Sequence, residues 1–518
     1  MFDLRPYQEA CVKAVREKWY DFRKVLMILP TGSGKTICFS KLIADCVEQG
    51  MRCLILAHRD ELIQQAVDKL KRSTGLDAAI EKAGASALDS IFKVTVGSVQ
   101  SLCREKRLHA FSKSHYDVII VDEAHHVLAD TYQRILDWFD EALVLGCTAT
   151  PDRGDKKNLG SFFDCIGYEY GLRDAITEGF LCPIVTQTCP IDIDLTQVKV
   201  TRGDFNDRDL GDALTPYLQE ISVKMGEFLS DRKTLTFLPL IATSQDMTGR
   251  LLTQGFQAQH IDGKSKDRRE ILAGFGDSQY NALQNAMLLT EGYDEPSITS
   301  VVVLRPTKSR PLYAQMVGRG TRIHPGKENL LLLDFLWHHE RHSLCKAASL
   351  VAKTEAVAKK MEEQAANAGF GGPIDLLGLE GMAMDSIRND RESTLARYLD
   401  QNKKRKAKTV DPVWFGLSMR DDEIVDYEPV FAWEKEKVSE KQANVLNRAG
   451  FDGDNMTRGF ASKILTRLFA RREEGLATPK MVSQLEKRGY PHSERLTFEQ
   501  ARDLMDQAAN SGWTKRWD

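Results

Sequence analysis

The sequence predicts an α/β protein in which two tandem parallel-sheet domains are followed by a mostly helical C-terminal region. Short apolar runs alternate with helical stretches over residues 1–344, which is typical of parallel sheets with crossover helices. A glycine-rich turn follows the first apolar run, and polar turns follow the later ones. An internal repeat of helical character then occupies the end of the chain. We expect four regions: residues 1–185, 186–344, 345–434 and 435–518.

Composition indicates a globular protein of several domains. The chain has 518 residues, of which 42% are hydrophobic, and its formal net charge is −3. A chain of this length has room for three or four domains. We expect no membrane partner and no signal peptide, because no apolar run approaches the ~20 residues of a membrane span. Any affinity for nucleic acid must come from a local basic surface, since the bulk charge is slightly negative.

The ten cysteines are scattered along the chain, without a Cys-x-x-Cys spacing. This pattern favours neither a zinc ribbon nor a disulfide framework. We therefore expect reduced thiols and a cytoplasmic location, associated with the nucleoid in a bacterium or in the host cytoplasm for a phage protein.

The first apolar run leads into a turn that has the composition of a phosphate-binding loop. Gly32 and Gly34 let backbone N–H groups turn inward onto a phosphate, Lys35 reaches its oxygens, and the Thr36 hydroxyl is a Mg²⁺ ligand. Leu29 stands where the general pattern has its first glycine. The remaining glycines still permit the turn.

A second motif, Asp122-Glu123-Ala124-His125, follows another apolar run. A carboxylate at the end of a buried strand can hold Mg²⁺, and its neighbour can polarise the attacking water. We assign these roles to Asp122 and Glu123 in that order. Each motif alone has a plain structural interpretation, but the two together predict hydrolysis of a nucleoside triphosphate.

Other turns of the first domain offer polar side chains. Gln8 begins a helix just upstream of the phosphate loop, and its amide offers a donor and an acceptor to adenine. Apolar runs that end near Ala57, Ser98 and Thr148 are followed by further polar turns. In a parallel sheet such turns gather at the carboxyl ends of the strands.

The second domain repeats the strand pattern without a phosphate loop of its own. Gln315, Arg319 and Arg322 lie near helical spacing, and arginines aimed at a neighbouring domain's γ-phosphate stabilise transition-state charge. The alternative interpretation is a surface pair of arginines in a salt-bridge network. We expect five strands here, at residues 234–238, 259–261, 287–290, 300–304 and 330–333.

Together these motifs resemble superfamily 2 helicases of the DEAD/DEAH type, with a Walker A loop and a DEAH box. The resemblance covers about residues 1–340, and within the superfamily the chain looks most like RadD-like repair helicases and the motor subunits of type I and III restriction enzymes. The resemblance to the RadD-like group in particular depends on two further segments, Arg305-Pro306-Thr307 and Gly203-Asp204-Phe205. The motifs that carry it are residues 4–8, 30–36, 122–125, 148–150, 290–294 and 315–322.

The resemblance implies two RecA-like domains with ATP and Mg²⁺ in the cleft between them. Glu123, Gln315 and the arginine fingers Arg319 and Arg322 would serve catalysis, while Thr36 and Asp122 would hold the metal. Thr148 and Thr150 would couple the nucleotide to the nucleic-acid face, which Arg59, Ser98, Gln100 and Lys264 would contact through phosphates. ATP itself would be held by Gln8, Thr31, Gly32, Ser33, Gly34, Lys35, Thr36, Gly292 and Asp294.

The C-terminal region is less informative. Residues 345–368 predict a helix, residues 403–408 are basic, and residues 410–434 favour a small β element. Residues 439–518 contain two copies of a unit of about 40 residues, each predicting two capped helices. Basic residues and tryptophans in the repeat suit a DNA anchor, whereas interspersed acidic residues suit a protein-docking domain, and the sequence leaves both roles open. The basic residues and tryptophans are Lys463, Arg467, Arg471, Arg472, Trp513, Lys515, Arg516 and Trp517.

The functional expectation is an ATP-dependent DNA helicase or translocase acting on duplex, forked or branched DNA, with single strands as a further substrate. One alternative is the ATPase motor subunit of a restriction or defence complex, with its nuclease on another chain. Another is an RNA helicase. DNA is favoured over RNA by the family resemblance alone.

Overall fold

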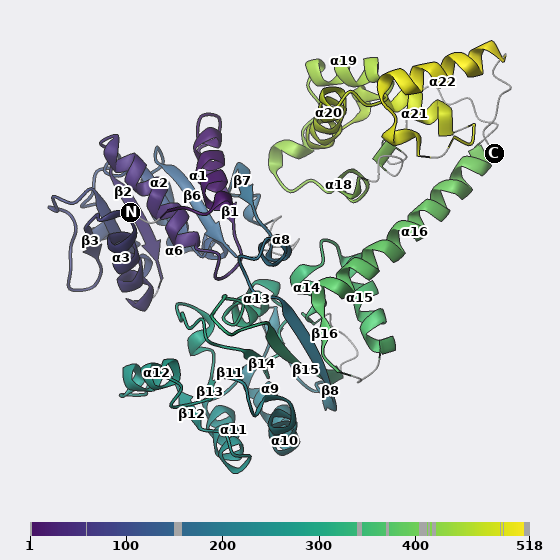
Figure 1. Ribbon diagram of the computed structural model, residues 1–518. Coiled ribbons are helices and arrows are strands. Elements are labelled where there is room, and N and C mark those ends of the chain that lie inside the picture. The colour runs from purple at the N-terminus through teal and green to yellow at the C-terminus, as the bar shows by residue number, and fades with distance from the viewer. Residues whose placement is uncertain are drawn as a thin grey trace. The chain divides into compact units, whose positions relative to one another are not determined.

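The protein is described by a computed structural model, in which the chain divides into two compact units, residues 1–383 and 384–518. Figure 1 shows the two α/β sheets of the first unit and the helices of the second. The described residues are 3–58, 60–149, 158–201, 203–338, 344–368, 372–402, 412, 415–416, 421–486, 488–490 and 492–511.

The first sheet has seven parallel strands in the order β3-β4-β2-β5-β6-β1-β7. Its central strands are buried along nearly their whole length, which explains why they read as continuous apolar runs. The strands are β1 (Lys24–Ile28), β2 (Cys53–Ala57), β3 (Ala78–Glu81), β4 (Val94–Ser98), β5 (Val118–Asp122), β6 (Leu143–Thr148) and β7 (Cys165–Glu169).

Helices connect these strands, and the register brings their carboxyl ends to one edge of the sheet. Asp122 pairs with Cys147, and Thr148 pairs with Ile28 at the start of the phosphate loop. The two predicted ATP motifs therefore meet around the end of β6. The connecting helices are α1 (Pro6–Lys18), α2 (Lys35–Glu48), α3 (Asp60–Thr74), α4 (Val99–Leu102), α5 (Glu105–Leu108), η1 (Ala124–His126), α6 (Asp130–Trp138) and α8 (Leu172–Thr177).

The second sheet has the order β12-β13-β11-β14-β15-β8-β16, and all its strands are parallel except the edge strand β16. Strand β8 precedes the domain's other strands in sequence and inserts beside β15. The strands are β8 (Ile184–Asp194), β11 (Thr234–Phe237), β12 (Ala258–Ile261), β13 (Ala282–Asn285), β14 (Ser300–Val303), β15 (Leu330–His338) and β16 (Ile374–Asp375).

A short hairpin of β9 (Val200–Thr201) and β10 (Asp204–Phe205) precedes the helices of this domain. Residues 345–368 contain two helices where a single helix was predicted. The helices are α9 (Asp207–Leu214), η2 (Thr215–Tyr217), α10 (Leu218–Leu229), α11 (Ile241–Thr253), α12 (Arg268–Gly276), η3 (Leu288–Thr290), α13 (Arg310–Gly318), α14 (Ala348–Val351) and α15 (Glu355–Ala368).

The predicted strand at residues 287–290 is wrong. Those residues form the 3₁₀ turn η3, entered through Met287 at φ 61°, and the strand is β13 instead. The strand was predicted from an apolar run, but β13 contains two buried polar residues, Gln284 and Asn285. Their amides are satisfied there: Asn285 Nδ2 donates to the Thr236 carbonyl at 2.9 Å, and Thr248 Oγ1 donates to Gln284 Oε1 at 3.2 Å.

Helix α16 (Leu376–Asn402) passes from the first unit into the second. The expected β element is not found in the described residues 421–434, which contain α18 (Asp422–Val425) and the start of the 3₁₀ helix η4 (Ala432–Lys435). The basic run at residues 403–408 lies outside the described residues. The remaining elements are α19 (Glu440–Ala449), η5 (Gly453–Asn455), α20 (Arg458–Glu473), α21 (Pro479–Glu486), η6 (Ser493–Arg495) and α22 (Phe498–Asn510).

The C-terminal repeat has two helices in each copy, with a 3₁₀ turn between them. Ser439 Oγ accepts the Gln442 N–H, and Thr497 Oγ1 accepts the Gln500 N–H, so these two predicted caps are present. The predicted cap at Thr457 is wrong, because its side chain makes no capping hydrogen bond to α20. Arg471 is buried and donates to the carbonyls of Ala477 and Glu494 at 2.8 and 2.9 Å. Arg471 is therefore not part of a DNA-contacting surface, one of the two roles that the sequence left open for these basic residues, because its guanidinium donates to backbone carbonyls of the second copy.

Among the described helices, none combines the length and the apolar composition that crossing a membrane requires.

Candidate nucleotide-binding site

A cavity of about 290 Å³ lies at the carboxyl edge of the first sheet and is lined from both α/β domains. Most of the predicted nucleotide residues line it. The second domain contributes Gly292, Tyr293, Asp294, Arg319 and Arg322. From the first domain come Thr31, Gly32, Gly34, Lys35, Thr36, Asp122, Glu123, Gln65, Lys69 and Arg72, with several apolar side chains.

The phosphate loop depends on two left-handed glycines. Gly32 has φ 87°, and Gly34, the residue that caps α2, has φ 84°. A side chain in this backbone region is strained, so glycine suits both positions. The loop presents the N-terminus of α2, with Lys35 and Thr36 in its first turn, toward the cavity, and this end of a helix attracts anions.

Gln8 holds the phosphate loop from outside the cavity lining. Its Nε2 donates to the Ser33 carbonyl at 3.0 Å, and its Oε1 accepts the Arg5 N–H at 3.0 Å. The Tyr7 hydroxyl donates to the same carbonyl at 2.6 Å. A Cβ on Gly34 would lie 2.6 Å from Gln8 Nε2. The contact of Gln8 with adenine remains a prediction, and the supporting role of Tyr7 was missed from sequence.

Asp122 and Glu123 lie side by side at the end of β5. Glu123 adopts φ 52°, a left-handed conformation that is uncommon for a residue with a side chain. Burial raises the pKa of Asp122, the charge of Glu123 raises it further, and Lys35 opposes both. A hydroxyl and a carboxylate are oxygen ligands of the kind Mg²⁺ prefers, so Thr36 and Asp122, both facing the cavity, fit this ion.

Two contacts join the domains at this cavity. Gln315 Nε2, on α13, donates to Glu123 Oε2 at 3.1 Å, and Gln315 is buried. At the end of the same helix, Gly318 lies so close to the phosphate loop that an added Cβ would be 2.6 Å from Thr31 Cβ. The described cleft is therefore in a closed arrangement, with α13 against the loop.

The two predicted arginine fingers differ in their contacts. Arg319 is buried and donates to the carbonyls of Thr290, at 3.0 and 2.5 Å, and Tyr293, at 2.7 Å. Arg322 forms an ion pair with Asp294 at 2.7 Å, and its Cγ would be 3.3 Å from a Cβ on Gly32. Arg319 thus supports the turn of its own domain, whereas Arg322 approaches the phosphate loop.

Helix α3 supplies lining residues that the sequence interpretation missed. Gln65, Lys69 and Arg72 face the cavity. Burial lowers the pKa of Lys69, and the nearby carboxylate of Asp294 opposes that change. Their spacing of four and three residues places them on one helical face, which is the signal that could have identified them.

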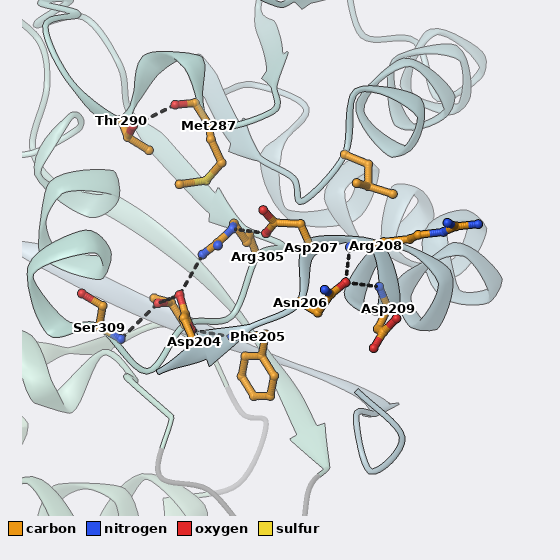
Figure 2. Close-up of polar contacts among 12 residues, drawn as sticks. Asp204, Phe205, Asn206, Asp207, Arg208, Asp209, Met287, Thr290, Arg305 and Ser309 are labelled. Carbon is orange, nitrogen blue, oxygen red and sulfur yellow. Dashed lines mark hydrogen bonds and ion pairs between the residues drawn. The ribbon is translucent and has the colours of Figure 1, made fainter. Parts of the chain in front are cut away.

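A brace in the second domain positions α13 (Figure 2). Arg305 Nε donates to Asp207 Oδ1 at 2.9 Å, and its Nη1 donates to Asp204 Oδ2 at 3.1 Å. Thr307 Oγ1 donates to the same Asp204 oxygen at 2.6 Å. Ser309 then caps α13 by accepting the Leu312 N–H. The brace ties the β9–β10 hairpin to the start of the helix that carries Gln315.

The predicted coupling and nucleic-acid residues are only partly described. Ser98 Oγ donates to Gln100 Oε1 at 3.1 Å, and Lys264 is exposed beyond the end of β12. The buried hydroxyl of Thr148 has no hydrogen-bond partner among the described residues. Arg59 and Thr150 lie outside the described residues. The contacts of these residues with nucleic acid remain predictions.

Comparisons with known proteins match both α/β domains. Residues 1–153 match the family model "Type III restriction enzyme, res subunit", and residues 216–324 match "Helicase conserved C-terminal domain". The chain is 33% identical over 358 residues to "Putative ATP-dependent helicase IRC3" of Saccharomyces cerevisiae, covering 64% of this chain and 51% of the yeast protein. The chain thus spans about half the length of this relative.

Two solved structures share the fold. A fragment of "a putative HsdR subunit of a type I restriction enzyme" from Vibrio vulnificus YJ016 superposes with a TM-score of 0.51 at 22% identity, over 64% of each chain. The "ATP-dependent Type ISP restriction-modification enzyme LlaBIII bound to DNA" superposes with a TM-score of 0.53 at 15% identity, over 100% of this chain and 44% of that one. At these identities the likeness shows the fold alone.

The fold comprises two RecA-like domains, and most of the predicted nucleotide-binding residues line the cavity between them. The two matched domains are those of a superfamily 2 helicase related to the motor subunits of restriction enzymes. The narrower likeness to RadD-like repair helicases remains a prediction.

Proposed function

We propose that this chain is an ATP-dependent DNA helicase or translocase that acts on duplex, forked or branched DNA. The contact between Gln315 and Glu123 carries the proposal, because it places a group of one domain on the predicted catalytic base of the other. ATP hydrolysis would then depend on the closed cleft, and cleft movement is how such a motor shifts along a strand.

The chain's own residues divide the chemistry. Lys35 and the N-terminus of α2 bind the phosphates, and Thr36 and Asp122 would hold Mg²⁺, which supplies charge neutralisation when bound. Glu123 orients and deprotonates the attacking water, while Gln315 fixes the Glu123 carboxylate. Arg322 neutralises charge that develops on the γ-phosphate, after exchanging part of its pairing with Asp294 for the phosphate.

DNA is the proposed polymer because one fold neighbour and one relative, a protein named as a DNA 3'-5' translocase, have names that point to it. LlaBIII is described as bound to DNA, and type I restriction enzymes give the chain one of its fold neighbours. A motor subunit of a restriction or defence complex is the second candidate, supported by the match of residues 1–153 to a restriction-enzyme subunit family. The scattered cysteines, which have no Cys-x-x-Cys spacing, favour a reducing, cytoplasmic location.

ATP turnover measured with no nucleic acid, single-stranded DNA, duplex DNA, forked DNA and RNA tests this proposal. We expect stimulation by duplex or forked DNA, and strand displacement on the fork when the motor unwinds. Stimulation of ATP turnover by RNA but not by DNA would indicate an RNA helicase instead. Stimulation by DNA only after a separate subunit is added would favour the restriction motor.

A further inference from the structure

A second polar cluster joins the two α/β domains outside the nucleotide cavity lining. We call it the His–Glu cluster; it consists of His58, His126 and Glu291. His58 directly follows β2, His126 ends η1, and Glu291 follows η3 in the second domain. The cluster therefore draws on both domains, and no role predicted from sequence involved it.

The distances in the cluster suit a metal ion. His58 Nε2 lies 3.1 Å from Glu291 Oε2, and one ligand atom from each of the three residues falls within 4.8 Å of the other two. Zinc lies about 2.0–2.2 Å from such ligands, and in a tetrahedral site two ligand atoms are then roughly 3.3 Å apart. The His58–Glu291 pair is close to this spacing, and the His126 donor lies within 4.8 Å of both.

The cluster lies in a largely buried environment. The side chains of His58 and Glu291 are only 16% and 10% exposed. Burial lowers the pKa of His126 to about 4, and the neighbouring His125 and His58 contribute in the same direction. The buried Nδ1 of His58 has no hydrogen-bond partner among the described residues.

We propose that His58, His126 and Glu291 form a binding site for a divalent transition-metal ion such as Zn²⁺, which bridges the two α/β domains and holds the cleft closed. Two imidazoles and one carboxylate, with water in the fourth position, are a donor set typical of zinc. The nitrogen donors distinguish this site from the all-oxygen Mg²⁺ site, because Mg²⁺ prefers oxygen ligands.

Bridging has a consequence for turnover. Release of the products of ATP hydrolysis requires the cleft to open, and the metal would have to leave Glu291 or the histidines first. We expect micromolar-range or tighter Zn²⁺ to inhibit turnover while Mg²⁺ remains in large excess. A chelator should reverse this inhibition.

Metal binding is measured on the full chain without nucleotide, by isothermal titration with Zn²⁺ and by the visible absorption of bound Co²⁺. We expect the wild-type chain to give the intense Co²⁺ bands of a four-coordinate site. His58→Gln and Glu291→Gln should each weaken binding by more than about 10-fold, since even the loss of an outer partner of a metal ligand costs about that much. His109→Gln removes an exposed histidine that stacks on Trp138, and it should bind metal like the wild type.

Inhibition is measured by comparing the ATP turnover of each protein with and without Zn²⁺. Zn²⁺ should inhibit the wild type and His109→Gln, and it should leave His58→Gln uninhibited over the same range. Binding that is unchanged in both ligand variants, with folding verified by circular dichroism, overturns the site. Metal binding without inhibition overturns the proposal that the metal holds the cleft closed. Because binding is read without ATP, failure of the proposed DNA motor activity leaves this result separately interpretable.

Discussion

Glu123 has a carboxylate that is constrained from two directions. Its backbone is in a left-handed conformation at the end of β5, and the Gln315 amide donates to it from the second domain. His125 Nδ1 lies 3.5 Å from the same oxygen. A carboxylate held in this way has a restricted orientation in the cavity, so we expect small changes at this residue to affect chemistry more than binding.

We expect Glu123→Gln to retain ATP binding while turnover falls by about 10²–10⁴-fold, because the amide cannot accept the proton of water. Lys35→Ala removes a positive charge beside the phosphates and should weaken ATP binding itself. Nucleotide titration and steady-state turnover separate the two effects. Near-normal turnover in Glu123→Gln would remove this residue as the base.

The arginines make a second pair of contrasting variants. Arg322→Ala should lower turnover by roughly 10³-fold with a small change in nucleotide affinity, because a finger acts mainly on the transition state. Arg319→Ala should also lower the melting temperature, since it leaves the carbonyls of Thr290 and Tyr293 without their donor in a buried turn. Thermal melts and turnover assays of both variants test these different roles. Wild-type melting temperatures and wild-type ATP turnover in both variants would contradict them.

At the scale of elements, helix α13 decides whether the cleft can close. Gly318 ends this helix where a Cβ would be 2.6 Å from Thr31 Cβ, and that atom is attached directly to the phosphate-loop backbone. The brace of Asp204 and Arg305 keeps the helix start in place. Closure therefore requires both a small residue at the end of α13 and a held position at its start.

Gly318→Ala should reduce turnover strongly while each domain remains folded, because the extra methyl group prevents the closed arrangement. The matched control is Gly249→Ala in α11, where nothing lies within 4 Å of the added Cβ. That control should leave turnover unchanged and be slightly more stable, by roughly 0.5–1 kcal/mol, since alanine favours a helix. Equal turnover in the two variants would contradict the close approach of α13.

Strand β15 contains a carboxyl group whose titration opposes folding. Burial raises the pKa of Asp334 to about 6 from its ordinary value of 3.8, so the folded state binds a proton more tightly than the unfolded state. The stability contribution of this group is therefore most favourable below about pH 4 and is lost as the pH rises through 6.

Asp334→Asn keeps the hydrogen-bond acceptor for the Phe335 N–H but carries no charge. We expect it to be more stable than the wild type at pH 7.5, by at most about 3 kcal/mol, and the advantage should shrink between pH 6 and 4. Melting temperatures of both proteins across this range provide the comparison. A constant difference at all pH values would show that Asp334 titrates normally.

At the scale of the whole molecule, the C-terminal repeat is a folding unit with its own core around Leu446, Phe451, Ile464 and Leu485. One of its arginines, Arg471, serves that core through backbone carbonyls. The outward basic charge of α20 therefore rests on fewer residues than the sequence suggested.

We expect deletion of residues 439–518 to leave DNA-independent ATP turnover unchanged and to raise the DNA concentration needed for half-maximal stimulation. The defect should shrink at low salt, where phosphate contacts strengthen. Titration of DNA at several salt concentrations measures both effects. Unchanged DNA dependence at every salt concentration would assign the repeat to a protein partner instead.

The local sequence determined the elements whose causes are local. The phosphate loop followed from an apolar run, two glycines and a helix start, because positive φ and helix capping depend on neighbouring residues. The repeat was read from capping residues at Ser439 and Thr497 for the same reason. The Asp122–Glu123 turn was identifiable because its strand is apolar and buried on both faces.

Only the tertiary structure decided which of these turns meet. Gln315 and Glu123 are 192 residues apart in sequence, and their contact depends on how two sheets pack, which no local pattern specifies. The different partners of Arg319 and Arg322 could not be predicted either, because helical spacing does not specify which carbonyl or carboxylate a guanidinium contacts. Strand β13 was misplaced because its polar side chains are stabilised by hydrogen bonds to neighbouring elements, and such partners exist only once the chain has folded.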